Sequence, residues 1–154
     1  MKSGPALNED FLDLLRCLGS AHADYVVVGA YALAVHGVAR ATGDIDIFIS
    51  PSPDNARRVL EALLRFGAPV EQHGIAAADL SKPDLVYQLG LPPRRIDLLT
   101  SISGVAFEEA ARTAQLVELE GLHVPFLGLQ ALLTNKRAAG RDKDLLDVKL
   151  LEQK

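Results

Sequence analysis

Hydrophobic residues recur along the chain with two periods, one typical of helices and the other of strands. Between residues 7 and 18 apolar side chains return every three or four positions, which predicts an amphipathic helix that stops at Gly19. The apolar, β-branched run at 25–28 predicts a buried strand. Residues 44–49 have the sequence Asp-Ile-Asp-Ile-Phe-Ile, and this alternation has the period of two that a half-buried strand requires.

The same two periods predict the remaining elements. Further helices are predicted at 30–36, 54–66, 103–111, 127–139 and 142–151, and further strands at 85–89, 95–99, 115–119 and 122–126. The pair Glu120-Gly121 indicates a tight hairpin between the last two strands, whereas residues 68–82 have no clear period and are predicted to be a loop. This order of elements predicts an α/β (α+β) fold with a small mixed sheet flanked by helices, in a single domain over residues 1–154.

Composition excludes several classes of protein. The chain has 154 residues, a hydrophobic fraction of 49% and a formal net charge of −4. The negative charge argues against a protein whose whole surface binds nucleic acid. Cys17 is the single cysteine and cannot form an internal disulfide. Because the sequence also has no basic-then-apolar leader and no apolar run approaching ~18 residues, we expect a cytoplasmic protein that does not contact a membrane.

Three aspartates stand singly among hydrophobic residues in the predicted strands. Asp44 and Asp46 are two positions apart, so both project from one face of their strand, and Asp97 interrupts a second apolar strand. Two carboxylates on one face repel each other, and either solvent at an exposed edge or a divalent cation must offset that repulsion. Pairing of the two strands would bring all three carboxylates to one patch that can bind metal ions. Asp84, in a predicted loop, is a weaker candidate for the third position.

A glycine joins the first predicted strand to the helix that follows it. Gly29, followed by Ala30, allows backbone N–H groups to approach phosphate oxygens closely, although an ordinary tight turn has the same sequence signature. The aspartate pair that begins fifteen residues further on favours the phosphate interpretation.

These segments together resemble a known family. The stretch 26–49, which contains the Gly-Ala turn and the Asp-Ile-Asp triplet, resembles the active-site signature of the nucleotidyltransferase superfamily (DNA polymerase β-like). More narrowly, it resembles the bacterial nucleotidyltransferases of the AbiEii/AbiGii toxin type, and the segments 95–109 and 135–148 are similar to that group as well. The resemblance covers nearly the whole chain.

The resemblance implies a role for each matching residue. Asp44 and Asp46 match the family's metal-binding pair, Asp97 matches its third carboxylate, and Gly29 matches the glycine of the phosphate-side turn. The bound ion would be Mg²⁺, with Mn²⁺ as a substitute, and the substrate a nucleoside triphosphate. The superfamily commonly has Gly-Ser or Gly-Gly at the turn, so Ala30 lacks a hydroxyl that would touch a phosphate.

Polar residues elsewhere complete the expected nucleotide site. Lys136 resembles the lysine that contacts nucleotide phosphates in these enzymes. Arg40 could bind phosphate or a carboxylate, and Thr42 beside it could contact the nucleotide or only bond to the backbone of the turn. His36 is expected to have a structural role at a helix end. The other nucleotide-binding candidates cluster near the start of the last predicted helix: Arg141, Lys143 and Asp144, with Asp147 in the same cluster but without an assigned role. Asp144 could orient a neighbouring cation or reach the base.

The sequence therefore predicts a Mg²⁺-dependent nucleotidyltransferase that moves a nucleoside monophosphate from a triphosphate to an acceptor. The toxin-type resemblance implies a macromolecular acceptor, a tRNA or a protein, and a cognate toxin or antitoxin partner. Two alternatives stay open, namely a non-catalytic nucleotide-binding partner protein that kept the fold, and an enzyme that modifies a small molecule of the aminoglycoside type. If the acceptor is macromolecular, we expect these basic residues to gather beside the metal site: Arg94, Arg95, Lys136, Arg137, Arg141 and Lys143.

Overall fold

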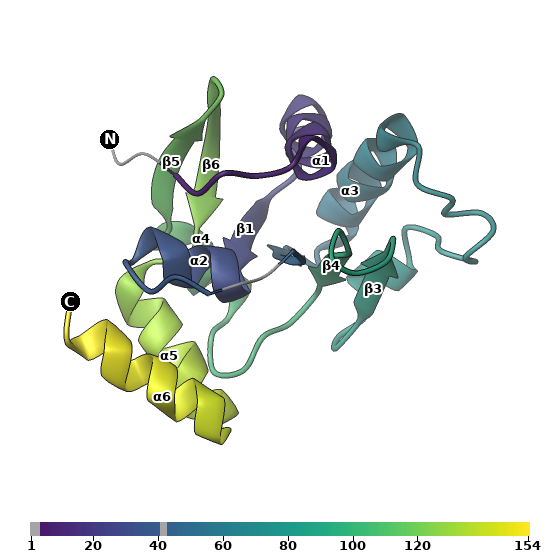
Figure 1. Cartoon of the computed structure of the whole chain (residues 1–154). Coiled ribbons are helices and arrows are strands. Elements are labelled where there is room, and N and C mark those ends of the chain that lie inside the picture. Colours follow the sequence, from purple (N-terminus) through teal and green to yellow (C-terminus); the bar gives the residue numbers. More distant parts are fainter. Residues whose placement is uncertain (1–3, 41–42) are drawn as a thin grey trace.

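One mixed sheet forms the centre of the protein. The computed structural model describes residues 4–40 and 43–154, and within them six strands lie in the order β3-β4-β2-β1-β6-β5 (Figure 1). The strands are β1 (Tyr25–Val28), β2 (Ile45–Ile49), β3 (Val86–Leu89), β4 (Ile96–Leu99), β5 (Gln115–Leu119) and β6 (Leu122–Phe126). The helices are α1 (Glu9–Ser20), α2 (Gly29–Val35), α3 (Pro53–Phe66), α4 (Phe107–Arg112), α5 (Leu129–Ala139), α6 (Asp142–Glu152) and a short 3₁₀ turn, η1 (Asp79–Ser81).

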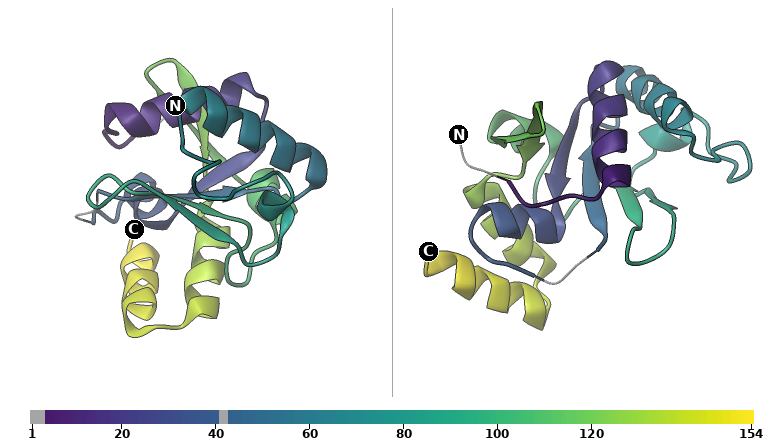
Figure 2. Two further views of the ribbon diagram at one scale, coloured as in Figure 1. Left: turned by 90° about the vertical axis from the view of Figure 1, so that its right-hand side faces the viewer. Right: turned by 45° about the horizontal axis from the view of Figure 1, so that its top comes forward.

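Helices cover both faces of this sheet. α1 and α3 pack on one face, and α5 with α6 lies on the other (Figure 2). Each layer has its own apolar core, and α2 contributes to both, since Val35 belongs to the first core and Leu33 to the second. The predicted fold class is therefore confirmed. Within residues 4–40 and 43–154, the helices are too short or too polar to span a membrane.

The alternation of β2 separates the two cores and directs its acidic residue. The three isoleucines of β2 are completely buried against α1 and α3, whereas Phe48 belongs to the core on the side of α5 and α6. Asp46 therefore projects from the same face as Phe48. β4 runs parallel to β2, and the register places Asp97 directly beside Asp46.

Most predicted element boundaries agree with the structure, and the exceptions have local causes. α1 continues one residue beyond Gly19, which keeps a helical backbone and is not left-handed. α3 begins one residue before its predicted start, because Ser52 caps it: the Ser52 hydroxyl accepts a hydrogen bond from the backbone N–H of Asn55, 3.2 Å away. α4 begins only at Phe107, since residues 102–105 form a separate turn.

Candidate active site

A cleft of about 950 Å³ lies between the sheet and the α5–α6 pair. Its volume is at the upper end of the range for small-molecule sites in proteins. The cleft collects most residues that the sequence assigns to a nucleotide site: Gly29, Ala30, Arg40, Asp46, Lys136, Arg141, Lys143 and Asp144. Thr42, also predicted to belong here, falls outside the described residues.

The acidic side of the cleft is built on two parallel strands. Asp46 of β2 and Asp97 of β4 are direct neighbours in the register, so their strands are roughly 4.8 Å apart at this point. Asp44 precedes β2 by one residue, and its Oδ1 accepts a hydrogen bond of 3.1 Å from the backbone N–H of Arg95. The structure thus brings the three predicted carboxylates to one patch, called the acidic patch below.

Arg95, directly before β4, supplies positive charge to this acidic patch. Its guanidinium donates to both carboxylate oxygens of Asp97, at 2.8 Å from Nε and 3.1 Å from Nη2. Nη2 also lies 3.6 Å from Oδ2 of Asp44. Bidentate pairs between arginine and a carboxylate are strong and geometrically specific. Arg95 therefore holds Asp97 in place and offsets part of the repulsion among the three acids.

The chemistry of the acidic patch suits a hard divalent cation, because Mg²⁺ prefers carboxylate oxygens as ligands. Among residues 4–40 and 43–154, however, no three His, Cys, Asp or Glu side chains already form a cluster that could hold a metal ion. The guanidinium of Arg95 engages Asp97 and Asp44 instead. A metal ion at the acidic patch would therefore share Asp97 and Asp44 with Arg95 or take its place.

Asp46 is energetically unfavourable in its ionised form. The pKa of Asp46 is raised to about 6, first by burial and then by the charge and hydrogen bonding of Asp97. Arg95 lowers this pKa without restoring it, and Asp44 adds a smaller increase. A cation close to Asp46 would favour the ionised carboxylate. The acidic patch is thus poised to bind positive charge.

Gly29 allows the turn between β1 and α2 to pass directly against Asp46. Its φ is +70°, in the left-handed region that side chains rarely adopt. A Cβ at this position would lie 2.2 Å from Oδ2 of Asp46. The glycine is therefore required by the neighbouring carboxylate as well as by the backbone, which is a reason that the sequence alone did not provide.

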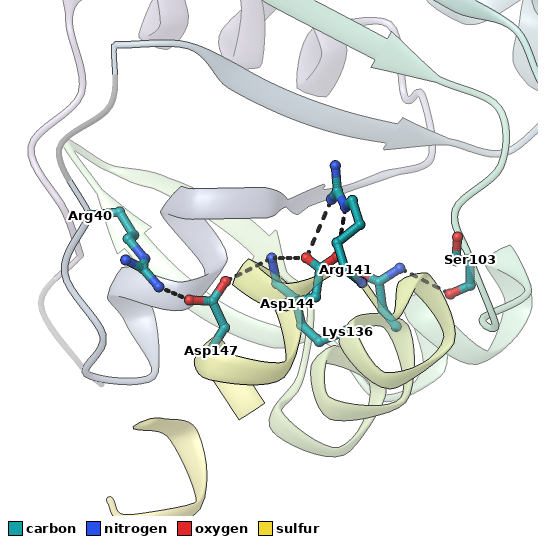
Figure 3. Close-up of polar contacts among 7 residues, drawn as sticks. Arg40, Ser103, Lys136, Arg141, Asp144 and Asp147 are labelled. Carbon is teal, nitrogen blue, oxygen red and sulfur yellow. Dashed lines mark hydrogen bonds and ion pairs between the residues drawn. The ribbon is translucent and has the colours of Figure 1, made fainter. Parts of the chain in front are cut away.

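The other side of the cleft carries cations that two buried aspartates hold, as Figure 3 shows. Nζ of Lys136 lies 3.4 Å from Asp144 and 3.2 Å from Asp147. Arg141 caps α6, and both its backbone N–H and its guanidinium donate to Asp144. Arg40, from the segment after α2, forms an ion pair with Asp147. These five residues form a continuous series of alternating charges, called the cationic wall below.

Pairing offsets the cost of burying the charges of this wall. Burial alone would raise the pKa of Asp144, but hydrogen bonds from Arg141 and the nearby charges of Lys136 and Arg141 together lower it below its ordinary value. Burial lowers the pKa of Lys136, and Asp144 counteracts that effect only in part. Asp144 therefore stays ionised and fixes the position of the ammonium group.

The remaining sequence candidates separate into residues inside and outside the cleft. His36 has a structural contact, with Nε2 2.8 Å from the carbonyl oxygen of Leu127. Asp84 lies before β3, where it accepts a hydrogen bond of 2.7 Å from Ser101, so Asp97 and not Asp84 neighbours Asp46. Of the six basic residues expected beside the metal site, the following line the cleft: Arg95, Lys136, Arg141 and Lys143.

Two residues of the site were not assigned these roles from sequence. The pairing of Arg95 with Asp97 could have been inferred, because residues two apart on a strand share a face. Asp147 clusters with Asp144 in the sequence, since residues three apart are neighbours on a helix, but this spacing does not reveal its role. Their partner Lys136 lies on a different helix, and that contact has no signature in the sequence.

We predict that Asp46→Asn makes the metal-free protein more stable at neutral pH. Because the folded-state pKa of Asp46 is raised to about 6, the ionised carboxylate destabilises the fold, and wild type loses stability relative to the variant as pH rises from about 4 through 6. At about 1.4 kcal/mol per pKa unit, the difference should reach on the order of 1–3 kcal/mol by pH 7. Urea unfolding in EDTA at several pH values measures it.

Asp79→Asn is the matched control for this measurement. The hydrogen bond from Lys82, with a second from the backbone of Ala76, lowers the pKa of Asp79. That variant should therefore lose stability relative to wild type as pH rises, the opposite sign. A difference between wild type and Asp46→Asn that did not change with pH would contradict the assignment of Asp46 as a destabilising carboxylate.

We also predict that Gly29→Ala disturbs Asp46, whereas Gly74→Ala does not. Both glycines have φ near +70°, at +70° and +67°, so both variants bear a similar backbone strain of about 1 kcal/mol. Only the new methyl at position 29 meets a carboxylate, while the space beside Gly74 is open. Unfolding and Mn²⁺ titration of the two variants should show an additional loss of both stability and metal affinity for Gly29→Ala. Equal behaviour of the two would contradict the contact.

The fold and the sequence both have known counterparts. A crystal structure from Thermotoga maritima, of a protein described as a candidate nucleotidyltransferase, has a TM-score of 0.54 with this chain at 15% identity, over 96% of this chain and 94% of that one. The lincosamide antibiotic adenylyltransferase LnuA, crystallised with lincomycin bound, has a TM-score of 0.54 at 13% identity, over 96% of this chain and 98% of that one. At these identities the two structures show a shared fold.

No curated protein sequence matches the chain. A family model does match, over residues 7–154, and its description is a nucleotidyl transferase of unknown function (DUF2204). This match confirms the nucleotidyltransferase part of the sequence resemblance and identifies the protein as an enzyme of that type. The narrower likeness to the AbiEii/AbiGii toxins stays a prediction. The chain therefore belongs to the DUF2204 family of nucleotidyl transferases.

Proposed function

We propose that the protein transfers a nucleoside monophosphate from a nucleoside triphosphate to an acceptor, with the acidic patch as its metal site. The observation that carries this proposal is the meeting of opposite charges in one cleft. Asp46 lines the same cleft as Lys136 and Arg141, and Asp97 lies beside Asp46 in the register. A triphosphate and a divalent cation need complementary surfaces of these two kinds.

The acids are proposed to hold the metal and to receive a proton. Asp44, Asp46 and Asp97 supply the oxygen ligands that Mg²⁺ or Mn²⁺ prefers. When bound, the ion would neutralise charge on the triphosphate and lower the pKa of the attacking hydroxyl. Asp97 accepts the proton of the acceptor's hydroxyl group while the oxygen of that hydroxyl bonds to the α-phosphorus. The bond between the α-phosphorus and the oxygen that bridges it to the β-phosphate breaks, and pyrophosphate leaves with the electron pair of that bond.

The cations and the β1–α2 turn are proposed to bind the phosphates. The proposed contacts are backbone N–H groups at Gly29 and Ala30, and the side chains of Arg40, Thr42, Lys136, Arg141 and Lys143, with Asp144 orienting the cations. Ala30 offers no hydroxyl, so side-chain cations take a larger share of phosphate binding than in relatives with serine there. Charge neutralisation and positioning, and not covalent chemistry, would supply the rate enhancement.

We further propose a macromolecular acceptor, a tRNA or a protein, and a toxin–antitoxin role with a cognate partner. The resemblance of segments 95–109 and 135–148 to toxin-type enzymes supports this proposal. Lys143 at the cleft and Arg94 next to Arg95 are exposed basic residues that such an acceptor could contact.

A small-molecule acceptor is the second candidate, and one specific observation favours it. LnuA is described as a lincosamide antibiotic adenylyltransferase with lincomycin bound, and the shared fold covers 98% of that chain. A chain of this size can therefore bind a small acceptor without an additional lobe.

Labelled nucleotides test both candidates together. Incubation of the protein with each α-labelled nucleoside triphosphate, Mg²⁺ and cell extract should label RNA or protein, and the Asp46→Asn variant should label neither. Label that appears only in small molecules would replace the macromolecular acceptor by the second candidate. Absence of any label and of pyrophosphate release under all four nucleotides would contradict the transfer reaction itself.

We predict that salt distinguishes an RNA acceptor from a protein acceptor. An RNA contacting several basic side chains should bind at least tenfold more weakly at physiological than at low salt, because bound counterions are released on association. A protein acceptor should respond less steeply. Triphosphate affinity, measured in parallel as the control, should change less in either case because metal coordination contributes to it. Fluorescence anisotropy of labelled RNA over a salt series measures the slope.

A further inference from the structure

Asp144 and Asp147 of α6 both line the cleft, and the proposed reaction gives neither of them a direct contact with the substrate. Asp144 is 0% exposed and Asp147 is 4% exposed. A carboxylate buried this completely remains ionised only when cations and hydrogen bonds surround it. Here three cations serve that purpose, from three different parts of the chain: Arg40, Lys136 and Arg141.

Lys136 is the cation that the two carboxylates share. Its ammonium group lies between them, 3.4 Å from Asp144 and 3.2 Å from Asp147, and its side chain is 12% exposed. An ammonium has three N–H donors, so these two contacts leave one for a ligand in the cleft that Lys136 lines. Lysine is otherwise a flexible side chain, and two buried partners are an unusually strong restraint on its position.

The charge balance of the cationic wall favours a polyanionic ligand. Arg40, Lys136 and Arg141 carry three positive charges against two negative ones, so the wall keeps a positive excess. Without Asp147, Arg40 and Lys136 would lose the carboxylate that they share. The carboxylates therefore stabilise a concentration of positive charge that a phosphate chain can use.

We propose that Asp144 and Asp147 are positioning residues for the nucleotide, acting through Lys136 to place its ammonium against the triphosphate. This inference rests on the proposed function, because it assigns the phosphates to the cationic wall. Asp147 gives the clearer test. Asp144 also caps α6 through Arg141, so its replacement would disturb the helix as well.

A double-mutant cycle between Lys136 and Asp147 tests the proposal. The dissociation constants of all four Mg²⁺–nucleoside triphosphates are measured for wild type, Lys136→Met, Asp147→Asn and the double variant. Each single variant should weaken binding by about tenfold, and the double variant should bind no more weakly than Lys136→Met alone, because Asp147 acts through a side chain that is then absent. Two effects that multiply in the double variant would overturn the proposal.

Stability is measured on the same four proteins, since Asp147→Asn removes the carboxylate that pairs with Arg40 and one of the two that hold Lys136. The double variant removes one charge of each sign and keeps the balance, so it provides the comparison with Lys136→Met even if the single variant does not fold. Binding by the double variant that is about tenfold weaker than by Lys136→Met would again overturn the proposal. Equal binding supports it.

Glu152→Gln is the matched control for α5–α6 docking. Arg137 and Glu152 form a further ion pair between these helices, at 2.8 Å, but neither residue lines the cleft. This variant should leave the nucleotide dissociation constant unchanged. If Glu152→Gln lost as much affinity as Asp147→Asn, weaker packing of α5 against α6 would account for both losses. That result would overturn the proposal that Asp147 positions Lys136. Failure of wild type to bind any of the four triphosphates would overturn the proposed function as well.

Discussion

Repulsion between Asp46 and Asp97 is the constraint to which the surrounding structure responds. The parallel register that buries the isoleucines of β2 also places the two acids side by side, and a shift by one residue would turn those isoleucines away from the core of α1 and α3. The acids therefore cannot separate without loss of the core. Arg95 offsets their charge, and Gly29 keeps side-chain atoms away from the Asp46 carboxylate.

In the cationic wall the repulsion is between positive charges, and it is offset in the same way, by groups of opposite charge. Buried carboxylates hold its cations, as a guanidinium holds two members of the acidic patch. Each group of like charges is thus restrained by opposite charges before any ligand is present. Restraint of this kind lowers the reorganisation needed when a charged ligand binds, which is the main electrostatic contribution that a folded site makes to catalysis.

Sequence periodicity predicts this fold well because its signals are local. The Glu120-Gly121 turn has two positive φ values, at +48° and +83°, as a tight hairpin of this kind requires, and both flanking strands have the predicted bounds. The candidate site was predictable only in part. Asp46 and Asp97 stand out among hydrophobic neighbours, but their contact depends on the parallel pairing of β2 with β4, which periodicity does not specify. Contacts between separate helices, such as that of Lys136 with Asp147, are equally invisible in the sequence.

Apart from Arg40, the two sides of the cleft are also separated in the order of synthesis. All three acids and Arg95 lie within residues 44–97, whereas Lys136, Asp144 and Asp147 are added only after all six strands of the described sheet have been translated. A nascent chain emerges from its N-terminal end. The ribosome-bound chain therefore contains every residue of the acidic patch while it still lacks the cations of α5 and α6. Translation of the α6 segment is the step that completes the second side of the cleft.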